Sequence, residues 1–403
     1  MRVSNSSRYG LPLVAALVLT AALSLWIARR NRPEISRAEQ DRQVHSLLQN
    51  TVKADNTLTY SAISTVTAMY GDHKVKARAR LVRAPRKLSI TYMDGDSKGL
   101  HSGYNEKWFW RQDSDNSPLR AYAEVEYRPY QMAEKRFELT TKNYRGRLLG
   151  SETLNGRLAQ IVELQRSQLI DGAPGPMKRL WIDQESGLTL RVDSFNYQAR
   201  KVMTSELSNI DLDPDVKDAF VPPAQMKTAA TMLPWMASEL GDQIQKVVQI
   251  TRIYPPQLDY VPPGFEFDSV GVHRCNDTGA KYVAALTRYS DGINVLTVFA
   301  MRPDAKLPGT SGSVNGSASA NAKGSGTKDN SKRQSCDFGM GTMVMRKLPA
   351  GRLIAVADLP PQTLNRVLDS TRIRFAPPGN VASSGAPSNG AASNGAPSNS
   401  SHR

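Results

Sequence analysis

Side chains able to do chemistry are few and scattered in this sequence. The five histidines lie too far apart to show the spacing of metal ligands: His45, His73, His101, His273 and His402. No Walker loop, HExxH zinc motif or GxGxxG dinucleotide loop occurs, and the one match to the letters GxSxG, at residues 95–99, lies in a predicted hairpin turn. Acid–base and nucleophilic catalysis therefore have no candidate residues, and neither a metal nor a cofactor is expected. The sequence favours a binding protein over an enzyme.

The two cysteines of the chain, Cys275 and Cys336, both lie in its last third. In an oxidising compartment, an even number of cysteines within one domain predicts a disulfide. The alternative is a pair of buried free thiols, because sequence alone does not show whether the two Cα atoms come within bonding distance.

Basic residues alternate with small apolar residues in one candidate strand: Lys74, Lys76, Arg78 and Arg80. Successive side chains of a strand point to opposite faces, so these four would form one basic row. Such a row could bind anionic lipid headgroups or an acidic partner peptide. The alternative is a solvated outer face that also discourages pairing with strands of other chains.

Aromatic side chains gather between residues 92 and 130. On the inner face of a curved sheet they would either fill the core or line a cavity for an acyl chain. Together with one later strand residue they provide four candidates for an apolar ligand pocket: Tyr92, Trp108, Trp110 and Trp181. A closed core is the alternative, because most apolar strand faces are simply packed.

One helix followed by many strands is expected to position these residues. Ser36 and Glu39 have the spacing of a capping box, and apolar residues follow at helical spacing from Val44 to Val52. From residue 57 to 210 the apolar period changes to two, with turn residues between the candidate strands. A second short helix is predicted over 130–141. This pattern predicts a single curved or partly closed antiparallel sheet.

A second unit is expected near residue 255, with hairpin strands, a Ser-Asp-Gly turn at 290–292 and a helix over the region of Leu364. Segments rich in Gly, Ser, Asn and Ala predict a mobile insertion over 304–335 and a disordered tail. The predicted division is a membrane segment over 1–33, a first domain over 34–223, a connector over 224–254, a second domain over 255–375 and the tail over 376–403.

The formal net charge of +15 comes from 52 Lys and Arg against 37 Asp and Glu. The excess is +5 in residues 1–37 (6 basic against 1 acidic), +4 in 38–230 (28 against 24) and +6 in 231–403 (18 against 12). A nucleic-acid-binding domain concentrates its positive charge on one face or in one region. The spread along this chain argues against nucleic acid as a partner.

Residues 11–28 form an uncharged and almost wholly apolar run with arginines on both sides. Its 18 residues lie between the core of a signal peptide and the length of about 20 that spans a membrane. An uncleaved inner-membrane anchor is the preferred interpretation, and a cleaved signal peptide is the alternative. With either interpretation, we expect the chain after about residue 33 to be periplasmic or otherwise extracytoplasmic.

The order of motifs resembles two known domains. Residues 144–164, followed by Leu-Trp-Ile-Asp-Gln-Glu-Ser-Gly-Leu-Thr-Leu-Arg over 180–191, resemble the strand hairpins of the lipoprotein-carrier (LolA-like) fold. Residues 258–265, 289–300 and 353–364 are similar to the C-terminal domain of the MucB/RseB regulators of envelope-stress sigma factors. Both domains occur in the order of that family.

The resemblance implies an α+β fold that is mainly β: an unclosed antiparallel β-barrel with helices across its mouth, then a smaller α/β domain. It also implies binding to the outer part of a membrane-spanning anti-sigma factor, which is shielded from proteolysis until a lipid or lipoprotein fills the apolar pocket. The anchor, the insertion and the tail depart from the family pattern. The alternative function is an envelope lipid or lipoprotein carrier without a signalling partner.

Overall fold

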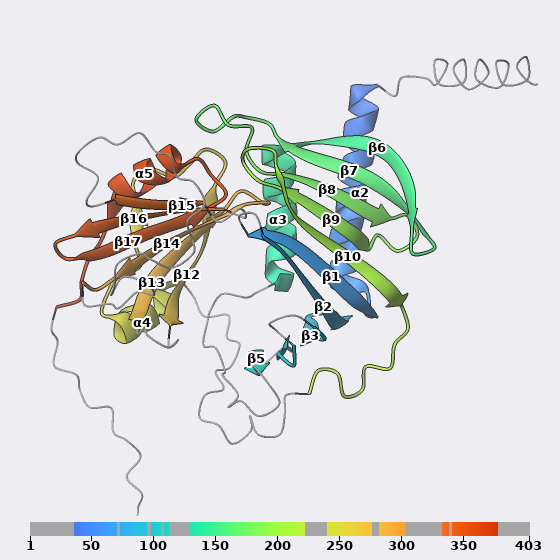
Figure 1. Cartoon of the computed structure of the whole chain (residues 1–403), viewed down its shortest axis with the longest axis horizontal. Coiled ribbons are helices and arrows are strands. Elements are labelled where there is room, and N and C mark those ends of the chain that lie inside the picture. The colour runs from blue at the N-terminus through green and yellow to red at the C-terminus, as the bar shows by residue number, and fades with distance from the viewer. Residues whose placement is uncertain are drawn as a thin grey trace, which may run out of the picture.

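The structure is a computed structural model (Figure 1) that describes most of residues 36–377. The described ranges are 36–70, 73–94, 98–105, 109–112, 129–221, 240–275, 282–303, 333–337 and 341–377. The predicted membrane segment 11–28 lies outside these ranges, as do the tail beyond residue 377 and the insertion as far as residue 332. Among the helices of the described ranges, none has the length and apolar character needed to cross a membrane.

Helix α2 (Arg37–Thr57) begins where the capping motif predicts. Ser36 is its N-cap, and the Ser36 hydroxyl oxygen accepts a hydrogen bond from the backbone N–H of Glu39 at 3.2 Å. The Glu39 carboxylate binds Arg42 and Gln43 instead of reaching back to the cap, so half of the capping box forms. The apolar side of the helix packs on the sheet through Val44 and Leu48.

A ten-stranded antiparallel sheet forms the first unit. Its strands are β1 (Tyr60–Tyr70), β2 (His73–Ala84), β3 (Lys87–Tyr92), β4 (His101–Tyr104), β5 (Phe109–Gln112), β6 (Tyr144–Leu154), β7 (Arg157–Arg166), β8 (Met177–Asp183), β9 (Thr189–Phe195) and β10 (Lys201–Asp211). Their order is β5-β4-β3-β2-β1-β10-β9-β8-β7-β6, with β5 and β6 at opposite edges. The sheet is therefore curved but unclosed, which confirms the predicted fold class.

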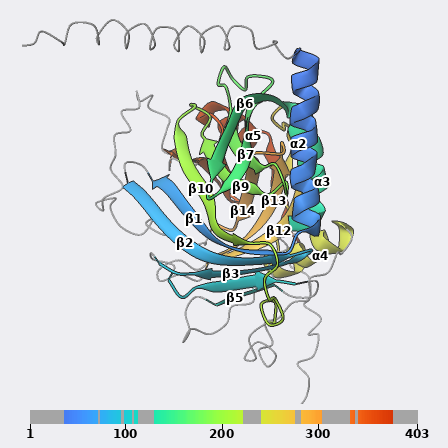
Figure 2. The ribbon, with the colours of Figure 1, turned by 90° about the vertical axis from the view of Figure 1, so that its right-hand side faces the viewer.

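Helices α2 and α3 (Pro129–Asn143) lie side by side along the sheet (Figure 2), as the predicted mouth of the barrel requires. Helix α2 also lies directly on the edge strand β6. The contact depends on Gly146, because a Cβ atom there would lie 2.2 Å from Cγ1 of Val44.

The second unit is a six-stranded antiparallel sheet in the order β12-β13-β14-β17-β16-β15. Its elements are α4 (Leu240–Thr251), β11 (Gln257–Leu258), β12 (Glu266–Cys275), β13 (Tyr282–Ser290), β14 (Val295–Met301), β15 (Arg333–Asp337), β16 (Thr342–Leu348), β17 (Gly351–Ala357), α5 (Pro361–Asp369) and β18 (Thr371–Arg372). The core lies between the sheet and its two helices and includes Val247, Leu296, Leu353 and Leu364. Helix α4 falls within the predicted connector and packs on β12 and β13.

The two cysteines belong to strands at opposite edges of this sheet, Cys275 on β12 and Cys336 on β15, although both side chains lie outside the described part. Five strand spacings of about 4.8 Å separate these edges by about 24 Å in an open sheet. A disulfide needs Cα atoms within about 7 Å. The backbone arrangement thus gives no support to the predicted disulfide. Whether two cysteines can meet depends on the order of the strands in the sheet, and the sequence does not reveal that order.

We expect Gly146→Ala to lower the free energy of unfolding by about 1–3 kcal/mol, because the added methyl group forces α2 away from β6. Gly241→Ala is the matched control, since nothing lies within 4 Å of the Cβ position there. Denaturant unfolding followed by circular dichroism measures both. Equal stability of the two variants would show that α2 is not seated on β6.

Candidate functional site

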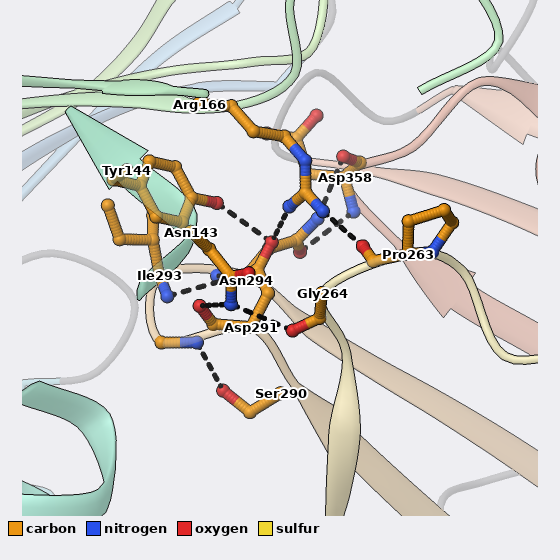
Figure 3. Close-up of polar contacts among 11 residues, drawn as sticks. Asn143, Tyr144, Arg166, Pro263, Gly264, Ser290, Asp291, Ile293, Asn294 and Asp358 are labelled. Atoms are coloured by element: carbon orange, nitrogen blue, oxygen red, sulfur yellow. Dashed lines mark hydrogen bonds and ion pairs between the residues drawn. The ribbon is translucent and has the colours of Figure 1, made fainter. Parts of the chain in front are cut away.

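The turn between β13 and β14 reaches from the second unit onto the first (Figure 3). Asp291 in this turn is fully buried. Its Oδ1 accepts hydrogen bonds from the backbone N–H groups of Ile293 at 3.0 Å and Asn294 at 2.7 Å. Gly292 has a φ of 101°, which favours glycine, and a Cβ atom there would lie 2.5 Å from the backbone nitrogen of Thr140. The turn therefore holds Asp291 rigidly and fits closely against α3.

A buried ion pair joins the two units at this turn. Oδ2 of Asp291 accepts hydrogen bonds from the hydroxyl group of Tyr144, at 2.8 Å, and from Nη1 of Arg166. Nη2 of Arg166 donates to the backbone carbonyl of Pro263. The side chains of Arg166 and Asp291 are 2% and 0% exposed. Burial, reinforced by the negative charge of Asp291, raises the pKa of the Tyr144 hydroxyl, so it stays protonated and donates.

Tyr144 and Arg166 are cross-strand partners at the open end of the β6–β7 hairpin, so strand pairing brings them together. The next residue back, Asn143, donates from Nδ2 to the carbonyl oxygens of Gly264 and Asp291 at 2.8 and 3.0 Å. The four side chains and the turn form what we call the junction, defined by Asn143, Tyr144, Arg166, Asp291 and Gly292.

A second contact joins the units away from the junction. Asp171, in the loop between β7 and β8, accepts hydrogen bonds from Thr363 and from Arg366 on α5. Ile170, beside it, is buried in the core of the second unit. The first unit is thus attached at more than one place, which limits rotation of one unit against the other.

A cavity of about 360 Å³ lies between the concave face of the sheet and helices α2 and α3. This volume falls in the range of about 300–1,000 Å³ that is usual for a small-molecule site. Much of the lining is aliphatic and includes Leu48, Val52, Leu180, Leu190, Val192 and Leu207. Gly292 and Ile293 of the junction turn also line it, so the cavity and the junction share a wall.

Charged groups also face the cavity. Arg83 and Asp55 form an ion pair at 3.4 Å. Lys178 on β8 faces it as well, and its pKa is lowered to about 8 by burial and by the positive charge of Arg136, against the opposing effect of Asp291. The cavity is therefore amphipathic, with a mainly apolar lining and cationic groups.

The structure does not bring the four predicted aromatic residues together in this cavity. Trp110 is fully buried with its ring edge-on to His101, and Tyr92 is half-buried. Trp181 is buried in a core cluster with Leu190 and Leu207 and is not part of the lining; its indole N–H donates to Glu152 at 2.6 Å and the Arg191 guanidinium lies over its ring. Trp108 lies outside the described residues. Aliphatic residues from many strands line the cavity instead. In the sequence, the alternation of apolar residues looks the same whether they line a cavity or fill a packed core.

The predicted basic row is exposed on one face of β2, with Lys74, Lys76, Arg78 and Arg80 all pointing to solvent. Arg78 makes an ion pair with Asp94 at 2.5 Å, and these contacts lower the pKa of Asp94. Strand β3 pairs with β2 only from Ala79 onward. Within the described strands, the outer edge of β2 is therefore open where the row begins.

We expect Arg166→Met to destabilise the protein by about 3–5 kcal/mol, because it leaves the Asp291 carboxylate buried without its cation. Lys142→Met is the matched control: it breaks the exposed Lys142–Glu266 pair, worth less than about 1 kcal/mol. Denaturant unfolding of both variants and of Arg166→Met/Asp291→Asn is the measurement. A loss in Arg166→Met no larger than in the control would contradict a structural role for the buried pair.

The chain is similar in fold to several solved structures, at low sequence identity. No curated protein matches it. A crystal structure of MucB in complex with MucA(peri) shares 14% identity and a TM-score of 0.48, covering 82% of this chain and 98% of that one. The structure of the MucA/MucB complex of Pseudomonas aeruginosa has 15% sequence identity and a TM-score of 0.49, and the match covers 83% of this chain and 99% of that one. A LolA superfamily protein from Nitrosomonas europaea has 12% sequence identity and a TM-score of 0.23, and the match covers 44% of this chain and 96% of that one.

The family comparison is direct for the first unit. Residues 43–225 match the model of the MucB/RseB N-terminal domain, a range that contains most of α2, all of α3 and all ten strands of the unclosed sheet. Those residues are therefore similar to the N-terminal domain of the MucB/RseB family, in agreement with the resemblance that the sequence predicted.

Proposed function

We propose that this protein is an extracytoplasmic regulator, not an enzyme, and that it binds the outer part of a membrane-spanning anti-sigma factor and shields it from proteolysis. The observation that carries this proposal is the match of residues 43–225 to the MucB/RseB N-terminal domain. The proposed compartment is the periplasm, with residues 11–28 attaching the chain to the inner membrane.

The basic row is the proposed contact for the partner. An extended peptide can add to the open edge of a sheet through its backbone, and its side chains then meet those of the edge strand. Lys74 and Lys76 are exposed beside such an edge, and Arg80 is exposed on the same face where β3 has begun to pair. Acidic side chains on the added segment would pair with them, which favours an acidic stretch of the anti-sigma factor. Anionic lipid headgroups carry the same kind of charge and are the other candidate ligand.

Release of the partner is the proposed role of the cavity. A lipid or acylated ligand that enters it would press on Ile293 and Gly292, which belong to the turn that holds Asp291. The ligand would thereby act on the junction between the two units. Contacts of the ligand with Tyr92, Trp108, Trp110 and Trp181 remain a prediction.

A carrier function without a signalling partner is the second candidate, and the amphipathic cavity favours it. Native mass spectrometry of the protein purified from membranes would separate the two. Bound lipid with no protein partner supports the carrier, whereas a stoichiometric protein partner supports the regulator.

We expect immobilised protein to capture a protein with a single membrane span from detergent-solubilised membranes of its own cell. Mass spectrometry identifies what is captured, and a column of the Arg166→Met variant tests whether capture needs the intact junction. Failure to capture any such protein under several envelope stresses would count against the regulator.

Reversal of the members of the basic row that form no ion pair with other described residues, Lys74→Glu/Lys76→Glu/Arg80→Glu, should reduce capture of that partner at least about tenfold, because attraction becomes repulsion. Arg78 is kept because it binds Asp94. The matched control is Lys217→Glu/Lys246→Glu/Lys347→Glu, which makes the same change of charge at exposed positions elsewhere. Equal capture by the two triple variants would leave the row as an ordinary solvated face.

A further inference from the structure

Two cationic side chains line the cavity without a counter-ion among the described residues. Lys178 comes from β8 and Arg136 from α3, and both line the cavity. Neither takes part in an ion pair or a side-chain hydrogen bond within the described part of the chain. The other charged residues of the lining, Arg83 and Asp55, are already paired with each other.

Burying even part of a cation without a partner is unfavourable, and Lys178, which is half-buried on β8, bears that cost. Burial is the largest cause of its lowered pKa, and the like charge of Arg136 adds to it. Asp291 acts in the opposite direction but is engaged by Arg166 and Tyr144. The cavity therefore presents positive charge that no carboxylate of the described residues neutralises at close range, beside a mainly aliphatic lining.

We propose that Lys178 and Arg136 form an anion-binding subsite within the cavity, which selects a single-chain amphiphile with an anionic headgroup such as a carboxylate or a phosphate. The headgroup supplies the counter-ion that the two cations lack. The alkyl chain lies along the aliphatic lining that includes Leu180 and Val192.

The position of this subsite adds a regulatory consequence to the proposed function, on which it rests. Gly292 fits against the backbone of Arg136 and Thr140 on α3, and Ile293 lines the cavity. A headgroup held by Lys178 and Arg136 therefore lies beside the turn that carries Asp291. An anionic amphiphile held in this way is placed to act on the junction. A neutral amphiphile of equal length lacks this anchor.

The test compares two probes of equal chain length, decanoate and 1-decanol, with inorganic phosphate as a third. Isothermal titration calorimetry of the full-length protein at pH 7 measures the three affinities. We expect decanoate to bind about 10-fold or more tightly than decanol, which is the effect of one hydrogen bond to a charged group. Lys178→Met should remove that difference and leave decanol binding unchanged, whereas Lys246→Met, an exposed lysine of α4, should change neither.

Arg136→Gln provides a second variant on an exposed residue, in case Lys178→Met perturbs folding. It should weaken decanoate binding but not decanol binding. In the unaltered protein, decanoate affinity should fall as the pH rises from 7 to 10, because the Lys178 ammonium loses its proton, while decanol affinity stays level. The other ionisable groups on the lining or acting on Lys178 are Asp55, Tyr60, Arg83, Arg136 and Asp291.

The outcomes separate the subsite from the wider function. Equal affinity for decanoate and decanol in every variant would overturn the subsite and leave the amphiphile cavity in place. Binding of neither amphiphile would overturn both. Binding of phosphate as tight as that of decanoate would overturn the role of the alkyl chain, because a small anion alone would then occupy the site.

Discussion

The buried pair of Arg166 and Asp291 is the interaction on which the arrangement of the two units depends. Neither charge reaches solvent, so each requires the other; Tyr144 also donates to Asp291, and the Pro263 carbonyl accepts from Arg166. Such a pair contributes less to stability than to geometry, because desolvation offsets much of the attraction while removal of one partner is costly. The pair therefore fixes where the β13–β14 turn meets the first unit.

The position of that turn links the junction to the cavity. Asp291 at its start is held by the ion pair, whereas Ile293 two residues later lines the cavity between the sheet and its helices. A change in what fills the cavity therefore acts on the same short segment that joins the units. In the proposed function, this shared wall is the feature through which an amphiphile in the cavity would act on the junction.

Sequence patterns predicted the fold in considerable detail and the site only in part. The cap at Ser36, the change of period after residue 57 and the turn at 290–292 are local signals, and the elements they predict are present. The junction depends on Arg166 meeting Asp291 across 125 positions, which no local pattern encodes. The aromatic residues were the stronger sequence signal for a pocket, but aliphatic residues from several strands line the cavity. Likewise, nothing in the sequence distinguishes Lys178 from other lysines in strands. Only the packing of α3 and of the β13–β14 turn places it in the cavity wall.

The central claim is that filling the cavity releases a partner bound elsewhere on the molecule. It is tested most directly by loading the immobilised protein with its membrane partner and measuring how much stays bound when decanoate is added. The account predicts that retention falls as decanoate saturates the cavity, and that it falls less with decanol at the same concentration. Retention unchanged by decanoate, at a concentration that calorimetry shows to be saturating, would contradict the account.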